Sequence, residues 1–328
     1  MRIKNVFFTL LILLGGCVTA SAQSESTSVF HFLKLPTSSH AMALGGTNVS
    51  IPDDDASLLF QNPALMANMS NKSINLSFLT YMQGCKAGNA SWVMAHGERG
   101  TWGVGAQFLG YGSMRGMTVD EVETGDFRAL DMAISGGYTY MLTEHIAGGV
   151  IGKFIYSKYD AYSSIALAVD LGFNYWNEDL NLSISTVAAN LGGQVKAFGD
   201  HHERLPFDLR IGFTKGFARA PIRFSVELAD LTRWRTKDYY TAGEELSGGR
   251  IFTNHLILGI DIVPMDLFYI SAGYNFRRAY ELKAAGSSHA AGLCFGAGLN
   301  LKKFSVGLSY AKYHVSMPAF MITAQYHL

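Results

Sequence analysis

The chain has 328 residues with 26 basic and 26 acidic side chains, so no net charge draws it to nucleic acid. Only 16% of its residues are charged, while 12% are aromatic and 35 are glycine. Typical soluble domains carry about a quarter charged residues, so this composition argues against a soluble α/β enzyme and favours a β-rich membrane protein.

The first 22 residues have the three parts of an export signal. Met1–Lys4 is basic, Val6–Leu14 is apolar but too short to span a bilayer, and Ala20–Ala22 forms a small-x-small cleavage site. We therefore predict a cleavable signal peptide over 1–22. The stretch that ends at Cys17 also resembles a lipobox, so lipidation of Cys17 stays an open alternative.

Residues 23–72 form a segment of their own before the first predicted strand. The pair Gly45 and Gly46 permits a tight turn, because glycine has no Cβ atom. Pro63 restricts Asn62 to extended backbone and ends the helical turn expected over 58–61. The site residues predicted here are Gly45, Gly46, Asp53, Asp54, Asp55, Asn62, Pro63 and Ala64. This position leaves the segment free to sit as a hatch inside a barrel.

From residue 73 onward, apolar and polar residues alternate, as in strands with one apolar face. The predicted strands are 73–82, 88–96, 101–112, 127–142, 145–159, 163–176, 179–191, 206–218, 221–231, 252–263, 266–276, 289–300, 303–313 and 318–328. Most have about ten residues or more, the length of a tilted membrane-spanning strand. We predict an all-β fold, a fourteen-stranded antiparallel transmembrane β-barrel over 73–328.

The connections between these strands alternate between very short and long. The long ones are 113–126, 192–205, 232–251 and 277–288. Bacterial outer-membrane barrels have short periplasmic turns and longer extracellular loops, whereas a soluble sandwich has no reason to sort its loops in this way. The pattern therefore predicts an integral protein of the bacterial outer membrane.

Charged residues recur on the strand face opposite the apolar one. They are Asp131, Lys153, Asp170, Asp208, Arg210, Arg223, Glu227 and Asp261. These side chains are expected to point into the lumen, where buried charges must pair. Both signs are present, so we predict a filled lumen with a paired charge network rather than an ion pathway.

The three consecutive acids Asp53, Asp54 and Asp55 have two interpretations. Clustered carboxylates suit calcium, but the spaced pattern of an EF-hand loop is missing. We expect instead that they cap the turn over 56–60 and pair with lumen bases such as Arg210 or Arg223.

The long loops carry residue types that are favoured at protein interfaces. The candidate partner-contact residues are His201, His202, Trp234, Arg235, Tyr239, Tyr240, Arg277, Arg278 and Tyr280. Local packing is the alternative for the aromatic ones. His201, His202 and Glu203 resemble a fragment of a metal site but lack a third ligand at helical spacing. We predict no metal and no cofactor.

Motifs of known enzymes are missing from the sequence. It contains no Gly-x-Ser-x-Gly, and the glycine pair at Gly103 and Gly105 lies inside a predicted strand, so it is no phosphate loop. Cys85 and Cys294 are either a disulfide or two free thiols. A barrel enzyme needs convergent acid and histidine groups at its rim, which only the single loop at 200–202 offers. The sequence therefore predicts a protein that is not an enzyme.

Three short motifs together resemble the N-terminal hatch of FadL-like outer-membrane proteins. They are Ala43–Thr47, Asp54–Ser57 and Asn62–Ala64. Members of that superfamily also have fourteen strands. Their known activity, a channel for hydrophobic solutes, is one function that the resemblance implies.

A closer resemblance is to the PorQ family of the type IX secretion system, which is related to PorV. It rests on Phe32–Gly46, Gly125–Asp131 and Leu205–Phe207. The resemblance implies a membrane anchor in the attachment complex, with PorZ as the main partner and PorU and PorV alongside. In that family's complex PorZ binds anionic lipopolysaccharide, PorU is a sortase-like protease, and PorV shuttles cargo.

Overall fold

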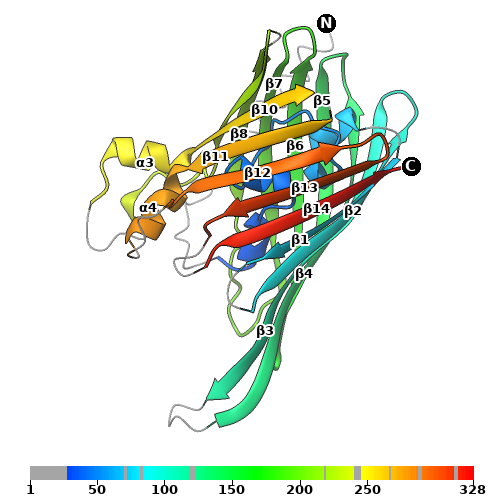
Figure 1. The fold of residues 1–328 in the computed structure, drawn as a ribbon. Coiled ribbons are helices and arrows are strands. Elements are labelled where there is room, and N and C mark those ends of the chain that lie inside the picture. The colour runs from blue at the N-terminus through cyan, green and yellow to red at the C-terminus, as the bar shows by residue number, and fades with distance from the viewer. Residues whose placement is uncertain are drawn as a thin grey trace, which may run out of the picture.

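The fold is a closed barrel of fourteen antiparallel strands (Figure 1). The computed structural model describes residues 28–328 except 70–71, 82–83, 118–122, 218, 240–244, 266, 285, 287–289 and 314–316. The strands are β1 (Lys72–Thr80), β2 (Lys86–His96), β3 (Gly100–Met117), β4 (Glu123–Met141), β5 (Ile146–Tyr159), β6 (Tyr162–Asn177), β7 (Leu182–Lys196), β8 (Asp208–Phe217), β9 (Ala220–Leu228), β10 (Leu256–Met265), β11 (Phe268–Asn275), β12 (Leu293–Asn300), β13 (Phe304–Ala311) and β14 (Ala319–His327). The predicted signal peptide, with Cys17, lies outside the described residues.

Pairing between the first and the last strand closes the barrel. Each strand pairs with its neighbours in sequence, and β1 pairs with β14 from Ser73–His327 to Thr80–Phe320 without a register shift. Short turns join the strands at one end, here called the short-turn end, and longer connections lie at the other, the long-loop end. The prediction of a fourteen-stranded closed antiparallel barrel is confirmed.

The barrel wall is apolar outside and polar inside, the reverse of a soluble protein. In β1, Leu76 and Phe78 are exposed, whereas Asn75 and Ser77 between them are buried. Large exposed apolar side chains recur on most of the other strands. Such an apolar band is the lipid-facing surface of a transmembrane barrel.

Within the described part of the chain, no helix is both long enough and apolar enough to cross a membrane.

Residues 28–69 lie inside the barrel as a series of short helical turns (Figure 1). They are η2 (His31–Lys34), α2 (Ser39–Ala43), η3 (Ala56–Phe60) and η4 (Pro63–Asn68). The side chains of Ser38, Asp55 and Asn62 cap the last three by accepting hydrogen bonds from backbone N–H groups. η4 contacts β4, β5 and β6, and α2 contacts β11 to β14, on opposite sides of the barrel. The segment therefore bridges the lumen; its behaviour as a hatch stays a prediction.

The N-terminal segment brings its own apolar core into this polar lumen. Leu44, Ile51, Leu58 and Leu65 pack together and are almost completely buried. Burying each such side chain contributes about 1.5–3 kcal/mol. The inner face of the barrel wall offers polar partners to the polar side chains of the N-terminal segment. The apolar side chains of the segment therefore pack against each other.

The long-loop end differs from the sequence prediction. The predicted loop 113–126 is mostly strand, since β3 and β4 extend as a ribbon, and β7 continues to Lys196. The predicted loops 232–251 and 277–288 contain η5 (Thr236–Asp238), α3 (Gly248–His255) and α4 (Phe276–Ala284). The predicted strand start at 252 is therefore wrong, because α3 occupies it. The predicted start at 289 lies outside the described residues, and β12 begins at Leu293.

Local signals explain both helices. Ser247 caps α3 by accepting from the backbone N–H of Arg250. Asn275 does the same for α4, accepting from the N–H of Arg278 at 3.0 Å. The α4 sequence is rich in Arg, Ala, Glu, Leu and Lys, which favour helix. Asn275 is the last residue of β11, and Ser247 lies in the connection before α3, so a search for alternation alone passes over both caps.

Candidate functional site

A ring of four charged side chains ties the N-terminal segment to the wall near the short-turn end. We call His40, Asp53, Arg223 and Asp261 the His40 ring. His40 lies 2.7 Å from Asp53 through Nδ1 and 2.8 Å from Asp261 through Nε2. Arg223 lies 2.6 Å from Asp53 and 2.9 Å from Asp261. Two bases and two acids thus alternate and join the segment to β9 and β10.

The ring sets the protonation of its members on the segment. Burial by itself lowers the pKa of His40, but the carboxylates of Asp261 and Asp53 outweigh it and raise that pKa to about 9. Burial also raises the pKa of Asp53, yet Arg223 and His40 hold it well below its usual range. At neutral pH His40 is therefore an imidazolium whose two N–H groups both donate to carboxylates.

We expect the folded barrel to lose stability as the pH rises from 6.5 to about 9. Folding raises the pKa of His40 from 6.5 to about 9, so its contribution is fully present below pH 6.5 and is lost as the pH passes through about 9. The shift corresponds to roughly 3 kcal/mol. Thermal unfolding in detergent from pH 6 to 10 measures it. His40→Gln should flatten this pH profile, and a profile identical to the wild type would contradict the assignment.

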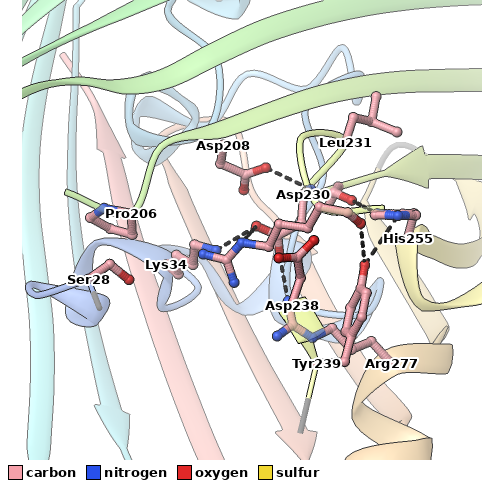
Figure 2. A network of polar contacts seen from close by, with 12 residues as sticks. Ser28, Lys34, Pro206, Asp208, Asp230, Leu231, Asp238, Tyr239, His255 and Arg277 are labelled. Carbon is pink, nitrogen blue, oxygen red and sulfur yellow. Dashed lines mark hydrogen bonds and ion pairs between the residues drawn. The ribbon is translucent and has the colours of Figure 1, made fainter. Parts of the chain in front are cut away.

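A second cluster, at the long-loop end, centres on Asp230 (Figure 2). We call Lys34, Asp230, Arg233 and Arg277 the Asp230 cluster. Asp230 contacts Lys34 of η2 at 2.6 Å and Arg277 of α4 at 2.7 Å, with Arg233 at 4.0 Å. Its backbone N–H donates to Asp208 of β8 at 2.7 Å. One carboxylate therefore joins the N-terminal segment, a helix of the long-loop end and the connection after β9.

Three bases determine the charge of Asp230. Burial raises its pKa, but Lys34, Arg277 and Arg233 outweigh burial and hold that pKa well below the usual range of a carboxyl group. The backbone of Asp230 adopts a φ of 55°, a left-handed conformation that few residues other than glycine, asparagine and aspartate accept. Asp230 is thus held by both its charge and its backbone.

The rings of Tyr239 and His255 lie beside the Asp230 cluster (Figure 2). Tyr239 is buried, and the guanidinium of Arg277 lies over its ring at 5.3 Å. His255 donates from Nδ1 to the carbonyl of Ala229 at 2.8 Å, and burial lowers its pKa. The rings of Trp234 and His255 are tilted by 39°, with centroids 4.3 Å apart. These contacts fix the connection after β9 against α3 and α4.

The predicted motif at 62–64 is a joint between the segment and the wall. Asn62 donates to the carbonyl of Val49 at 2.8 Å and accepts from the N–H of Ala64 at 2.9 Å. Thr139 of β4 donates to the carbonyl of Pro63 at 2.5 Å. The motif therefore caps η4 and bonds it to the wall at the same point.

We expect Gly149→Ala to destabilise the barrel by about 1–3 kcal/mol, the usual cost of overpacking. A Cβ atom at Gly149 of β5 would lie 2.6 Å from the carbonyl carbon of Pro63 and 2.7 Å from the nitrogen of Ala64. The matched control on the same strand is Gly152→Ala, whose Cβ finds its first neighbour at 3.9 Å. Thermal unfolding compares the two, and equal melting temperatures would contradict the close approach.

Gly45 and Gly46 end α2 in the way the sequence suggests. Their φ angles are 109° and 99°, which side chains rarely allow. The N–H of Gly46 donates to the carbonyl of Ala41 at 2.9 Å, and Asn275 donates to the carbonyl of Gly45 at 3.1 Å. The turn after α2 is therefore bonded to the end of β11.

The other predicted lumen charges are buried and have partners. Lys153 pairs with Asp170 at 2.6 Å, and Arg210 pairs with Asp208 at 2.6 Å. Asp131 accepts from Tyr111 at 2.7 Å, and Glu227 accepts from Ser50 at 2.6 Å. Of the two bases that the sequence suggests as partners of the three acids, Arg223 pairs with Asp53, whereas Arg210 pairs with Asp208 instead.

The three consecutive acids do not converge. Asp53 belongs to the His40 ring, Asp54 lies 3.6 Å from His327, and Asp55 caps η3 by accepting from the N–H of Ser57 at 2.8 Å. They line a cavity of about 330 Å³ near the short-turn end. In the described ranges, no three His, Cys, Asp or Glu side chains are grouped so that they could hold a metal ion.

The predicted partner-contact residues divide into two groups. His201, His202, Trp234 and Arg235 are exposed. Tyr239, Arg277 and Arg278 are used inside the protein, and the guanidinium of Arg278 lies 3.7 Å from the ring centre of Tyr313. Tyr280 is half-buried, and Tyr240 lies outside the described residues. A contact role for these residues stays a prediction, and the exposed four are the side chains most accessible for it.

Cys85 and Cys294 are free thiols, so the alternative of a disulfide between them is not seen. Cys294 is buried and lies 3.9 Å from a guanidinium nitrogen of Arg278. Cys85 lies 4.0 Å from the carbonyl of Tyr111. Both cysteines act as small packing residues next to the long-loop end.

The sequence analysis did not identify three central residues of the two clusters, His40, Lys34 and Asp230. His40 and Lys34 fall inside the motif at 32–46, but neither stood out as charged residues facing the wall. Asp230 falls near the end of the strand predicted over 221–231, whereas the structure ends β9 at Leu228 and places Asp230 in the connection that follows. A search for charges at strand ends that face a buried segment would have found it.

Comparisons with known proteins concern the fold. No family model matches the sequence, and no curated protein matches it. Among solved structures, TodX, the toluene transporter of Pseudomonas putida, superposes with a TM-score of 0.57 at 12% identity, over 89% of this chain and 96% of that one. The CymD monoaromatic hydrocarbon channel gives 0.56 at 12%, over 90% and 98%.

A FadL homologue of Pseudomonas aeruginosa gives a TM-score of 0.53 at 11% identity, over 88% of this chain and 98% of that one. These identities are low, so the likeness is one of fold. The chain has the barrel architecture of FadL-type outer-membrane proteins.

Proposed function

We propose that this chain is a non-enzymatic outer-membrane protein that anchors a surface protein at its long-loop end. The observation that carries the proposal is the Asp230 cluster. Through the buried carboxylate of Asp230, this cluster holds together three parts of the long-loop end: the N-terminal segment, the connection after β9 and α4. A rigid surface of this kind suits the binding of a protein partner, because little ordering is needed on binding.

The barrel wall supports the proposed location in the outer membrane. Its exposed apolar band suits lipid, and its short turns and long connections are sorted to opposite ends. In this orientation the long-loop end faces the outside of the cell and the short-turn end faces the periplasm. The solved barrels of similar fold are named as transporters and channels rather than enzymes.

The anchored partner that we propose is PorZ, with PorU and PorV in the same type IX attachment complex. The support is the sequence resemblance of Phe32–Gly46 to the PorQ family. That stretch supplies Lys34, His40 and Gly45 to the contacts described above. By this proposal the chain holds PorZ near the anionic lipopolysaccharide of the outer leaflet.

Gentle detergent extraction of a tagged chain from its native membrane tests the proposal, with mass spectrometry of what stays bound. We expect recovery of a PorZ-like surface protein. A Trp234→Ala, Arg235→Ala double variant should lower that recovery about tenfold or more, as for interface hot spots. The control is Lys302→Ala, an exposed change at the short-turn end. Recovery of the barrel without any surface protein would contradict anchoring.

A FadL-type channel for hydrophobic solutes is the second candidate. The fold shared with TodX and CymD, whose names state toluene transport and a monoaromatic hydrocarbon channel, favours it. The cavity near the short-turn end has several carboxylates and histidines in its lining, including Asp55 and His327, which does not suit a hydrocarbon. A fatty acid or aromatic hydrocarbon retained by the purified barrel in place of a surface protein would support the channel.

A further inference from the structure

The ribbon formed by β3 and β4 projects beyond the rest of the barrel (Figure 1). Pairing of β3 with β2 ends at Gly110, and pairing of β4 with β5 ends at Ala129. β3 and β4 continue to pair with each other as far as Met117 and Glu123. Beyond the wall, both outer edges of the ribbon therefore lack a strand neighbour among the residues described.

The outer face of β4 shows where the ribbon leaves the membrane. On the outer face of β4, Ile134 and Leu130 are exposed apolar residues of the wall. The next two outward positions are Arg128 and Asp126, and Asp126 pairs across the ribbon with Arg115. This change from apolar to charged side chains marks the boundary between lipid and water. The edges of the ribbon consequently stand in water.

The two faces of the ribbon differ in character. Met114 and Phe127 are directly opposite each other on the face that continues the inside of the barrel. The other face carries Arg115, whose guanidinium lies 3.6 Å from Glu123. Both side chains of that ion pair are largely exposed, 78% and 65%, so it contributes little and can be exchanged for another partner.

The two edges are also different. The edge of β4 is irregular, because Gly125 has a φ of 103°. The edge of β3 from Ser113 to Met117 has no residue of positive φ and stays extended. Among the residues that the structure describes, no strand pairs with this edge beyond Gly110, and such an edge in water is a template for another strand.

We propose that the β3 edge at Ser113–Met117 binds an extended segment of the anchored surface protein by strand addition. The proposal rests on the proposed anchoring function and names its docking mode. Backbone hydrogen bonds supply the affinity, and alternate side chains supply the specificity. The segment places an apolar residue beside Met114 and an acidic residue beside Arg115, at neighbouring positions on opposite faces.

Amide hydrogen exchange on the purified complex tests this mode directly. The probe is the surface protein that is retained by the wild-type barrel, compared with the barrel alone. The amides of Ser113–Met117 should exchange at least about tenfold more slowly in the complex, as for newly paired strands. The amides of 123–128 on the other edge serve as the internal reference and should change much less.

Two matched charge reversals test the specificity. Arg115→Glu should weaken retention of the surface protein about tenfold, because like charges then meet across the added strand. Arg128→Glu makes the same change on the other strand and should leave retention close to the wild type. A third variant replaces 112–127 with an Asn-Gly turn; it keeps the wall pairing through Gly110 and Leu130 and should lose the partner.

Each outcome decides between the two proposals. A surface protein retained equally by the wild type and the shortened ribbon, with unchanged exchange at Ser113–Met117, overturns strand addition and leaves anchoring in place. A wild-type barrel that retains no surface protein overturns anchoring and, with it, this docking mode. Protection of the same amides by self-association of the barrel alone also overturns it, since the occupant would be a second copy.

Discussion

Replacing Asp230 with alanine is expected to destabilise the long-loop end by about 3–5 kcal/mol, the usual cost of removing one partner from a buried charge cluster. Lys34, Arg277 and Arg233 would then be left facing each other without their shared carboxylate. We expect α4 and the segment around Lys34 to become sensitive to protease together. Limited proteolysis of the barrel in detergent, with mass spectrometry of the cut sites, measures this.

Glu281→Ala is the matched control for Asp230→Ala. Glu281 also contacts Arg277, at 2.7 Å, but its side chain is 44% exposed. An exposed ion pair of this type contributes about 0–1 kcal/mol, so the control should leave the cut sites unchanged. Equal protease patterns for the two variants would show that Asp230 does not hold the segment and α4 together.

Asp53→Ala is expected to release the N-terminal segment from the short-turn end at a cost of about 3 kcal/mol or more. It leaves Arg223 and His40 with the single carboxylate of Asp261, so a buried positive charge loses half of its compensation. The melting temperature in detergent should fall. The pH dependence between 6.5 and about 9 should shrink as well, since one of the two carboxylates that raise the pKa of His40 is gone.

The neighbouring acid provides the comparison. Asp54→Ala removes a side chain that is 37% exposed and lies 3.6 Å from His327, so its expected effect is about 1 kcal/mol or less. If the Asp53→Ala variant loses more stability than the Asp54→Ala variant, the effect comes from the specific contacts of the His40 ring and not from acidic residues in general. Equal losses of stability in Asp53→Ala and Asp54→Ala would favour the general patch.

The barrel could be predicted because the same two patterns, one within strands and one between them, repeat along the chain. A strand between lipid and a polar lumen alternates at every residue, as Leu76 and Ser77 do in β1, and the sorting of turns and loops repeats between strands. The charges on the inner face follow from the same alternation. Strand number, closure and the inward direction of Lys153 or Asp261 therefore needed no knowledge of distant contacts.

The pairing of those charges could not be predicted, because it depends on where a distant segment lies. Lys34 meets Asp230 across 196 residues, and His40 meets Asp261 across 221. The alternation of polar and apolar residues along a strand predicts that its charged side chains face inward. It does not predict which of these side chains form pairs. The helices α3 and α4 were missed for a related reason, since their caps at Ser247 and Asn275 are local signals of a different period.

The place of the N-terminal segment also sets an order of assembly. Thr139 of β4 bonds to Pro63 of η4 across 76 residues, whereas Ser39 bonds to Thr323 of β14 across 284 and Ala56 to Gln325 across 269. Contacts between distant residues close large loops and form slowly. We therefore expect the η4 contacts to form before the β14 contacts. By this order the N-terminal segment acts as a template on which the sheet closes. The last strand, β14, then completes the barrel by bonding both to this segment and to β1.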